Sequence, residues 1–434
     1  MTPVQAQSLP LILAGRDVLA QAQTGSGKTA AFALGLLAKV DVAAYYIQGV
    51  VMCPTRELAE QVAEEIRRLA RSQANLKVLT LCGGVPARAQ ALSLQHGAHI
   101  IVGTPGRVLD HLNQERLDLT RVHTLVLDEA DRMLDMGFQD ELDKIVAAIP
   151  AARQNLMFSA TFPAEIASLA KKLMQSPEHI VVAEVRVDDA IEQVFYQVSS
   201  KQREDAVMQL LLERQPKNAI LFCNTKRDTH ELYTVLRNNQ FSVMALHGDL
   251  EQKDREQTLM LFNNQSVRIL VATDVAARGL DIKALDLVIN VNLAHDADTH
   301  IHRIGRTGRA GEKGLAITLV TDADAYKFSL LQDALKQHVA LQALPASSDQ
   351  PAQPQAADMA TIQILGGKKD KLRPGDIVGA LTKDNRIDFE KVGKINVQSQ
   401  VSYVAVRRNA AKQALAVLTN DKLKGRRFRA RLLT

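Results

Sequence analysis

The feature that most constrains the fold is an alternation of short apolar runs with helical patterns over the first 340 residues. Runs that are apolar along their whole length are typical of strands buried on both faces, as in parallel sheets covered by helices. The series restarts after residues 176–190, where a proline and a charged extended stretch break the helical pattern. The sequence therefore predicts two α/β units joined by a hinge in that segment. The predicted strands are DVLAQA, GVVMC, KVLTLC, HIIVG, TLVLD and NLMFS, then NAILFC, SVMALH, VRILVA, LDLVINV and GLAITLV.

A second boundary lies at residues 344–357, whose sequence LPASSDQPAQPQAA is rich in Pro, Ser, Gln and Ala and has no apolar periodicity. Such a composition is typical of a linker. The residues that follow are predicted to form strands plus a helix, and hence a small α+β domain. We therefore expect domains at 1–183, 191–343 and 358–434.

Charge is distributed unevenly along the chain. The net charge is +5 overall, but residues 355–434 hold 17 Lys and Arg against 7 Asp and Glu, which is +10, and leave the rest at −5. A compact basic module on a mildly acidic body favours a polyanion partner, most often nucleic acid, over the alternative of a merely solvated basic face.

The sequence predicts a soluble, cytosolic protein without a membrane partner. Its longest apolar runs, LPLILAG and AAFALGLLA, are far shorter than the roughly 18 to 20 residues that a membrane span needs. Cys53, Cys82 and Cys223 form no CxxC pair and each lies in a predicted strand, so we expect small buried side chains rather than redox or metal chemistry.

A phosphate-binding loop is predicted between the first strand and the next helix. Glycines in such a loop let backbone N–H groups turn toward a phosphate, Lys28 supplies positive charge, and Thr29 offers a hydroxyl to Mg²⁺. The flanking strand and helix favour this interpretation over a chance glycine-rich turn. The loop consists of Ala22, Gln23, Thr24, Gly25, Ser26, Gly27, Lys28 and Thr29.

Acidic residues follow the predicted strand in LVLDEAD, residues 125–131. In enzymes with such a loop, an acid at the end of a neighbouring strand holds the Mg²⁺, and a further acid positions the attacking water. We therefore predict Asp128 as the metal ligand, together with Thr29, and Glu129 as the base, with Asp131 in a structural or linking role. Without the loop, this cluster would more often be a solvated helix start.

Two arginines in HRIGRTGRAG, residues 302–311, come from the second predicted unit. Arg306 and Arg309 are candidates for arginine fingers, an effect worth roughly 10³ to 10⁵ in rate where it operates. The alternative is a basic turn. A site divided in this way would be active only when the two units close.

Together these segments resemble those of DEAD-box RNA helicases. Such proteins have two RecA-like domains, bind ATP and Mg²⁺, and separate short RNA duplexes locally. The spellings DEAD and SAT separate the chain from DEAH-type and DNA helicases. The matching segments appear in the family's order: TPVQ at 2, AQTGSGKT at 22, PTREL at 54, GG at 83, TPGR at 104, DEAD at 128, SAT at 159, FCNT at 222, QKDR at 252, ATDVAARGLD at 272 and HRIGRTGR at 302.

The resemblance implies roles for further residues. Gln5 is expected to read adenine, Asp281 to contact the ribose, and Ser159 and Thr161 to couple hydrolysis to unwinding. Relatives carry residues upstream of TPVQ, including an aromatic that stacks on adenine, whereas this sequence opens at MTPVQ, a difference that bears on the affinity for ATP. The expected RNA-backbone contacts, which position but do not specify, are Arg56, Gly84, Thr104, Arg107, Arg255 and Thr273.

The basic C-terminal region resembles the RNA-recognition-motif-like (RRM-like) domain of bacterial DEAD-box helicases that recognise a hairpin in the peptidyl-transferase region of 23S ribosomal RNA. This resemblance implies a role in 50S subunit assembly. The region holds three aromatics, Phe389, Tyr403 and Phe428, so we expect recognition by basic loops and hairpin shape more than by base stacking. The candidate RNA-binding residues are Lys368, Lys369, Lys371, Arg373, Arg407, Arg408, Arg426, Arg427 and Arg429.

The sequence thus predicts a monomeric, RNA-stimulated ATPase and helicase. An RNA-binding assembly scaffold with a weakened ATP site is the alternative from another class, and a DNA translocase is a third. Intact Lys28, Asp128, Glu129, Arg306 and Arg309 argue against the scaffold, and the motif spellings argue against DNA.

Overall fold

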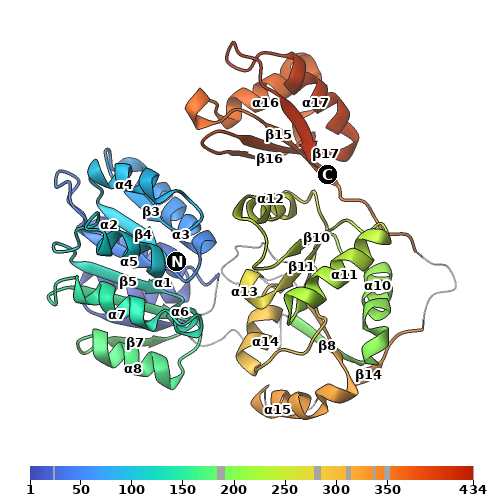
Figure 1. The fold of residues 1–434 in the computed structure, drawn as a ribbon, viewed down its shortest axis with the longest axis horizontal. Helices are drawn as coiled ribbons and strands as arrows, with labels where there is room; N and C mark the ends of the chain where they lie inside the picture. Colours follow the sequence, from blue (N-terminus) through green and yellow to red (C-terminus); the bar gives the residue numbers. More distant parts are fainter. Residues whose placement is uncertain are drawn as a thin grey trace. The chain divides into compact units, whose positions relative to one another are not determined.

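The computed structural model describes residues 1–22, 25–182, 191–277, 285–308, 314–335, 339–346 and 352–433. The chain divides into two compact units, Met1–Val185 with Arg278–Asp281 and Arg186–Ala277 with Ile282–Thr434. Figure 1 follows the chain from blue to red, and each unit is described separately below.

The first unit is built on a seven-stranded sheet with the strand order β3-β4-β2-β5-β6-β1-β7. All six strand pairs are parallel, with Asp128 opposite Phe158 and Gln21 opposite Ser159. The carboxyl ends of these strands therefore meet at one edge. The strands are β1 (Val18–Gln21), β2 (Gly49–Met52), β3 (Val78–Leu81), β4 (Ile100–Gly103), β5 (Thr124–Asp128), β6 (Gln154–Ser159) and β7 (Glu178–Val181).

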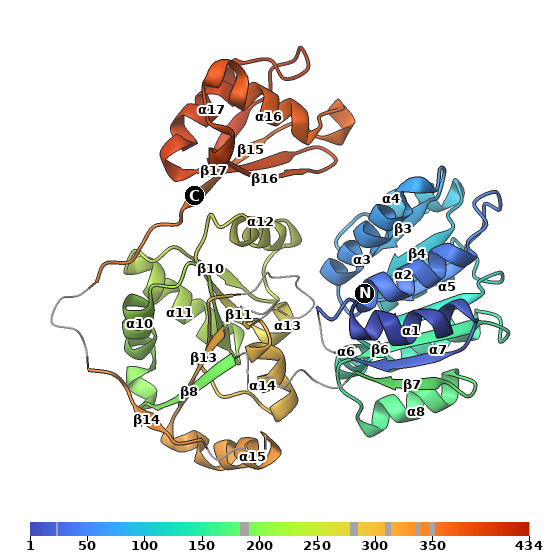
Figure 2. The same cartoon turned by 180° about the vertical axis from the view of Figure 1, so that it is seen from behind.

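Helices cover both faces of this first sheet (Figures 1 and 2). One core packs Phe32, Leu36 and Ile66 against the strands, and the other uses side chains such as Val108 and Ile145. Helix starts follow local capping signals: Thr2 and Gln5 form a capping box, and Thr55 caps the third helix. The helices are α1 (Pro3–Leu13), α2 (Lys28–Lys39), α3 (Arg56–Leu69), α4 (Ala87–Gln95), α5 (Pro105–Asn113), α6 (Ala130–Asp135), α7 (Gln139–Ala147) and α8 (Ala164–Leu173).

The second unit repeats this design. Its large sheet has the order β10-β11-β9-β12-β13-β8-β14, and its strand pairs are again parallel. The strands are β8 (Ile191–Gln197), β9 (Ala219–Cys223), β10 (Val243–Leu246), β11 (Ile269–Thr273), β12 (Leu287–Asn290), β13 (Gly314–Val320) and β14 (Gln342–Ala343). The helices are α10 (Arg203–Arg214), α11 (Lys226–Asn238), α12 (Gln252–Asn263), α13 (Asp274–Ala277), α14 (Ala297–Ile304) and α15 (Ala325–Leu335).

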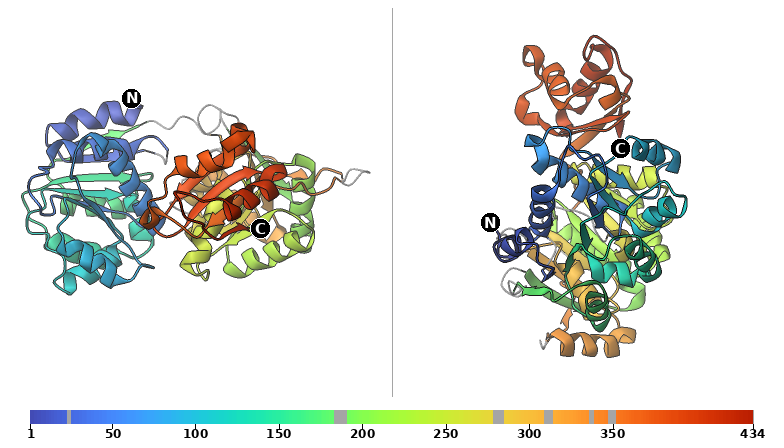
Figure 3. Two further views of the ribbon diagram at one scale, coloured as in Figure 1. Left: turned by 90° about the horizontal axis from the view of Figure 1, so that it is seen from above. Right: turned by 90° about the vertical axis from the view of Figure 1, so that its left-hand side faces the viewer.

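The same unit also contains a small antiparallel sheet, which we call the tail module (residues 352–433; Figures 1 and 3). Its strand order is β16-β17-β15-β18, and two helices pack on one face around Ile362, Val404 and Leu418. The sequence analysis expected one helix here. The second begins at Pro374, which is favoured in a first turn, and Asp376 accepts from the backbone N–H of Arg373. The elements are β15 (Met359–Ile364), α16 (Pro374–Thr382), β16 (Val392–Val397), β17 (Ser402–Arg407), α17 (Ala411–Asn420) and β18 (Ala430–Leu433).

The predicted fold class is confirmed: two parallel α/β sheets precede a small α+β module, and all eleven apolar runs contain strands. Three strands, β7, β8 and β14, were missed. Strand β7 lies inside the segment predicted as a hinge and pairs with β1, while residues 183–190 lie outside the described part of the chain. The three cysteines are free and buried, as expected. No helix among the described residues is long and apolar enough to cross a membrane.

Candidate nucleotide and RNA sites

The predicted nucleotide-binding residues of the first unit gather at the carboxyl edge of its sheet. The phosphate-binding loop follows β1, Asp128 ends β5, and Ser159 ends β6. In open α/β sheets this edge is where ligands bind. The strand order places these three segments on neighbouring strands, since β1 pairs with β6 and β6 with β5.

The described part of the phosphate-binding loop is shaped by glycines. Gly25 and Gly27 have φ angles of 86° and 94°, in the left-handed region that favours glycine. Lys28 is buried and its Nζ donates to the carbonyl of Ala22 at 2.8 Å, so the ammonium group lies over the loop. Thr29 lies in the first turn of α2, while Gln23 and Thr24 fall outside the described residues.

Gln5 lies directly against this loop. Its Nε2 donates to the carbonyl of Gly27 at 3.1 Å, and its Oε1 accepts from the backbone N–H of Thr2 at 3.0 Å. A Cβ at Gly27 would come within 2.5 Å of Gln5 Nε2. A glycine is therefore required at 27 both for its φ angle and for this close approach.

Asp128 has the environment of a metal-binding carboxylate. It is 2% exposed, and its Oδ1 has no hydrogen-bond partner among the described residues. Burial raises the pKa of Asp128 to about 6, Lys28 opposes that rise, and Glu129 adds to it. A buried carboxylate oxygen without a partner is costly unless a ligand satisfies it, so Asp128 and the Thr29 hydroxyl fit a Mg²⁺ ion.

Glu129 begins helix α6 with φ 53° and ψ 53°, a left-handed conformation that costs energy for a residue other than glycine. Its Oε2 accepts from Arg132 Nη1 at 2.6 Å, and both side chains are buried. Arg132 was not among the residues predicted from the sequence. This ion pair fixes the direction of the Glu129 carboxylate.

Asp131 joins two sequence motifs. Its Oδ2 accepts from the Thr161 hydroxyl at 2.9 Å and from the backbone N–H groups of Ala160 and Thr161 at 3.2 and 3.0 Å. Ser159, next to them, is fully buried, and its Oγ has no hydrogen-bond partner within the described chain. The loop after β6 is therefore held by the acidic segment after β5.

The candidate RNA contacts of the first unit also follow strand ends. Arg56 begins α3 and donates from Nε to Glu60 at 3.0 Å, Gly84 has a φ angle of 74°, and Thr104 precedes α5. Arg107 Nη1 donates to the carbonyl of Val85 at 2.8 Å, which ties α5 to the segment after Gly84.

Gln90 is a buried residue in this region that the sequence analysis missed. Its Nε2 donates to the carbonyl of Cys82 at 2.9 Å, and its Oε1 accepts from Arg107 Nη1 and from His111 Nε2, both at 2.9 Å. One amide therefore joins the end of β3, helix α4 and helix α5. Since Oε1 can only accept, His111 carries its proton on Nε2, and burial lowers the pKa of that imidazole.

In the second unit, Arg306 is buried just after α14. Arg255 Nη2 donates to the carbonyl of Ala276 at 2.8 Å, and Thr273 ends β11. Asp281 and Arg309 lie outside the described residues.

Arg303 is a further buried residue that the sequence analysis did not single out. Its Nε and Nη2 donate to the two carboxylate oxygens of Asp274, each at 2.6 Å, and Nη2 also donates to Asn224 Oδ1 at 2.7 Å. Nη1 donates to the carbonyl of Asn292 at 2.8 Å. This one guanidinium connects α14 with the segments after β9, β11 and β12. Arg303 lies inside the matching segment HRIGRTGR, and this position could have identified it from the sequence.

All nine candidate RNA-binding residues of the tail module are exposed. Seven belong to two loops, residues 366–373 and 422–429, which touch: Lys424 Nζ donates to the carbonyl of Lys371 at 2.8 Å. Arg407 and Arg408 lie elsewhere. Arg408 Nε donates to the carbonyl of Ala357 at 2.6 Å, beside β15.

Comparison with known proteins agrees with this architecture. Residues 2–169 match the DEAD/DEAH box helicase family, residues 202–311 the helicase conserved C-terminal domain, and residues 361–432 the DbpA RNA binding domain. The chain is 51% identical over 433 residues to the ATP-dependent RNA helicase DbpA of Escherichia coli (strain K12), covering 100% of this chain and 94% of the relative.

Two further proteins match the helicase part. The DEAD-box ATP-dependent RNA helicase CshA of Bacillus cereus is 43% identical over 337 residues, covering 77% of this chain and 64% of the relative. The structure of S. cerevisiae Dbp5 bound to RNA and ADP BeF3 matches with a TM-score of 0.72 and 32% identity, over 79% of this chain and 90% of that one. This chain belongs to the DEAD-box family of ATP-dependent RNA helicases.

Proposed function

We propose that this helicase is directed by its tail module to a hairpin of 23S ribosomal RNA and unwinds short neighbouring duplexes during 50S subunit assembly. The observation that carries the proposal is the pair of exposed basic loops on a module that matches the DbpA RNA binding domain. Basic loops without exposed sheet aromatics suit recognition of a folded RNA element by shape and phosphate contacts. The proposal includes a monomer in the cytoplasm with domains at 1–183, 191–343 and 358–434 and a linker at 344–357.

In the nucleotide site, Gln5 reads adenine, Asp281 contacts the ribose, and residues 22–29 surround the phosphates. The contact between Gln5 and Gly27 supports this, because it ties the adenine-reading residue to the phosphate loop. Lys28 balances the phosphate charge, and Thr29 and Asp128 hold Mg²⁺. When bound, that ion neutralises charge that develops on the phosphate oxygens.

For hydrolysis, Glu129 orients and deprotonates the attacking water, and Arg306 and Arg309 stabilise charge in the transition state. The ion pair with Arg132 supports the role of Glu129, because it fixes the carboxylate. Ser159 and Thr161 couple hydrolysis to unwinding. The Asp131–Thr161 hydrogen bond supports this coupling, since it connects the acidic segment with that loop.

RNA is held through its backbone by the helicase core, with ATP and single-stranded RNA closing the two units so that a short duplex cannot stay paired. The core contacts are Arg56, Gly84, Thr104, Arg107, Arg255 and Thr273. The tail contacts are Lys368, Lys369, Lys371, Arg373, Arg407, Arg408, Arg426, Arg427 and Arg429.

The test is steady-state ATP hydrolysis without RNA, with generic RNA, and with a 23S fragment that carries the hairpin. We expect the fragment to stimulate hydrolysis at concentrations at least about tenfold lower than generic RNA does. The variant Lys369→Glu/Arg427→Glu should lose this advantage, whereas Lys383→Glu/Lys412→Glu, with the same charge change on other surfaces of the module, should keep it. Equal stimulation by both RNAs would refute the targeting, and hairpin binding without hydrolysis would instead support an RNA-binding scaffold.

A further inference from the structure

The sheet face of the tail module that lies opposite its helices is not open to solvent. Thr361, Gln363, Tyr403 and Leu433 are each less than 9% exposed. In an ordinary RRM this is the face on which bases stack. Here it is covered by the second large-sheet domain of the same unit.

The contact has an apolar part and a hydroxyl part. Leu261 and Val267, from α12 and the segment before β11, share one buried cluster with Tyr403 and Leu433. Beside them, Thr361 Oγ1 accepts from Asn264 Nδ2 at 3.1 Å and lies 2.7 Å from Ser266 Oγ. The buried hydroxyl of Thr361 is thus satisfied only by groups from the other domain among the described residues.

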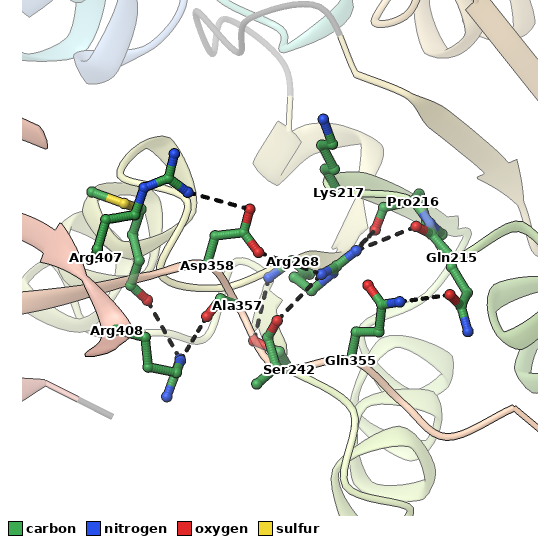
Figure 4. A network of polar contacts seen from close by, with 12 residues as sticks. Gln215, Pro216, Lys217, Ser242, Arg268, Gln355, Ala357, Asp358, Arg407 and Arg408 are labelled. Atoms are coloured by element: carbon green, nitrogen blue, oxygen red, sulfur yellow. Dashed lines mark hydrogen bonds and ion pairs between the residues drawn. The ribbon is translucent and has the colours of Figure 1, made fainter. Parts of the chain in front are cut away.

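Arg268 holds the edge of this contact (Figure 4). Its Nε and Nη2 donate to the carbonyl of Pro216 at 3.1 and 2.8 Å, and Nη2 also reaches the carbonyl of Gln215 at 3.2 Å. On the tail side, Nη1 donates to the carbonyl of Ala356 at 3.2 Å and lies 3.9 Å from the Asp358 carboxylate.

Asp358 extends this network into the tail module, because Arg407 lies 3.7 Å from its other carboxylate oxygen (Figure 4). The Arg268 side chain is only 9% exposed, so undocking would leave a guanidinium that has lost its tail partners. A buried guanidinium with hydrogen-bond partners in both domains favours one docked position of the tail module, which we call its seat, over a loosely tethered arrangement.

We propose that Arg268 and Thr361 are positioning residues that hold the tail module in one seat on the second large-sheet domain. An RNA element bound by the basic loops then stands at a fixed offset from the RNA path of that domain. The helicase would therefore act best on duplexes at one spacing from its target element. This inference rests on the proposed function, because it needs the tail module to bind that element.

The experiment measures unwinding of one short duplex placed at a series of spacings from the 23S hairpin, with the full-length protein. We expect the wild type to prefer one spacing by about tenfold. Arg268→Ala and Thr361→Lys, which disturb the contact from opposite sides, should reduce this preference to within about twofold, because a flexible tether spreads the effective concentration over many spacings. Lys217→Ala, an exposed neighbour in Figure 4, is the control.

A covalent lock supplies the converse test. The side-chain oxygens of Ser266 and Thr361 are 2.7 Å apart, so Ser266→Cys/Thr361→Cys should form a disulfide, and the three native cysteines are buried. The oxidised protein should keep the preferred spacing, and adding Arg268→Ala to it should then have no effect.

Four results would count against the proposal or its basis. An unchanged spacing preference in both Arg268→Ala and Thr361→Lys would overturn the seat, as would loss of unwinding in the locked protein that reductant restores. A proportional loss at every spacing would assign Arg268 a merely structural role. No advantage of hairpin RNA in the wild type would instead refute the proposed targeting.

Discussion

The two large sheets of this helicase have the same strand order, since β3-β4-β2-β5-β6-β1-β7 in the first unit corresponds strand by strand to β10-β11-β9-β12-β13-β8-β14 in the second. Their carboxyl edges nevertheless differ in chemistry. In the first unit the central strand β5 ends in Asp128, whereas its counterpart β12 ends in Asn290.

The difference extends to how the polar groups are satisfied. Among the described residues, Asp128 Oδ1 and Ser159 Oγ, at the ends of β5 and β6, are buried without hydrogen-bond partners in the first unit, and so is Asn290 Oδ1 at the end of β12 in the second. In the second unit, Arg303 makes four hydrogen bonds to Asp274, Asn224 and Asn292. Buried polar groups left unsatisfied point to a ligand, whereas a satisfied network fixes structure. The unsatisfied atom that ends β5 belongs to a carboxylate and the one that ends β12 to a neutral amide, so we propose a cation-dependent site at the first edge and, around Arg303, a structural scaffold at the second.

Of the substitutions that test this difference between the two units, that of Asp128 should have the largest effect. Asp128→Asn removes a carboxylate that burial makes costly, so the nucleotide-free protein should gain up to roughly 3 kcal/mol in the free energy of unfolding at neutral pH. The sign follows from the raised pKa of Asp128, about 6: the folded state loses stability as this group ionises. RNA-stimulated hydrolysis should fall by about 10³-fold, because the proposed Mg²⁺ ligand is lost.

Thermal unfolding and steady-state ATPase assays measure the two effects. Asp131→Asn is the matched control: Asp131 accepts hydrogen bonds from the Thr161 hydroxyl and from the backbone N–H groups of Arg132, Ala160 and Thr161, so its substitution should destabilise the protein. A loss of stability in Asp128→Asn would contradict the view that this carboxylate is held unsatisfied for a ligand.

In the second unit, Arg303→Met should lower stability by an amount comparable to the gain expected for Asp128→Asn. It leaves the Asp274 carboxylate without its bidentate partner, which should cost about 3–5 kcal/mol. Hydrogen exchange measured by mass spectrometry should show the loss in α14 and in the strands β9, β11 and β12.

The control for this prediction is Arg227→Met, because Arg227 forms an exposed ion pair with Glu231 whose loss should have little effect on stability. Adding Asp274→Leu to Arg303→Met should recover part of the loss, since it removes the uncompensated charge. Equal protection in the wild type and Arg303→Met would disprove the structural role of this network.

His300 should make the second unit the more acid-sensitive one. It is fully buried, its Nε2 lies 3.0 Å from Gln193 Oε1, and burial followed by the nearby charge of Arg303 lowers its pKa to about 4. In the unfolded state His300 therefore binds a proton near pH 6.5, whereas in the folded state it does so only near pH 4. Stability is complete above that pH and falls as the pH drops toward 4, by on the order of 2 kcal/mol at pH 5.

Urea unfolding at pH 7 and pH 5 measures this effect. His300→Gln cannot titrate, so it should be less stable at pH 7 but should show a smaller difference between the two pH values. If the variant and the wild type lose the same free energy of unfolding between pH 7 and pH 5, groups other than His300 cause the acid sensitivity.

The sequence predicted the fold well because the strongest signals are local. Continuous apolar runs mark buried parallel strands, and all eleven were found. Strand β8 was missed because Glu192, Gln193 and Gln197 interrupt its apolar residues, although it pairs with β13 along its whole length. Strand β14 has only two residues and depends on β8 for its pairing.

The site was predictable only in part. Motifs identified Lys28, in the first turn of α2, and Asp128, at the end of β5, but not the partners that hold such groups. Arg132 pairs with Glu129 inside one helix turn, whereas Ser266 and Thr361 meet across 95 positions of sequence through tertiary packing. No spacing rule within a single sequence connects such residues, because the fold alone brings them together.

The smallest expected effect concerns Gln90, whose buried amide holds Arg107, a candidate RNA contact of the first unit, against the end of β3. Gln90→Leu keeps the size of the side chain but leaves the carbonyl of Cys82 and the N–H groups of Arg107 and His111 without this amide. Arg107 and the loop at Gly84 should then lose their fixed geometry, and the affinity of the core for single-stranded RNA should fall about tenfold, which is 1.4 kcal/mol.

Fluorescence anisotropy with a generic single strand measures this affinity, and ATP binding without RNA, which uses the other end of the sheet edge, should change less than twofold. Ser93→Ala, on the same helix but with an exposed hydroxyl bond to the carbonyl of Ala89, is the control and should bind RNA as the wild type does. Gln90→Glu separates positioning from packing: a carboxylate still accepts from Arg107 and His111 but cannot donate to Cys82, so it should retain more RNA affinity than Leu. If Gln90→Leu binds RNA normally, the amide is a packing element, and the candidate RNA contacts of the first unit do not depend on this buried support.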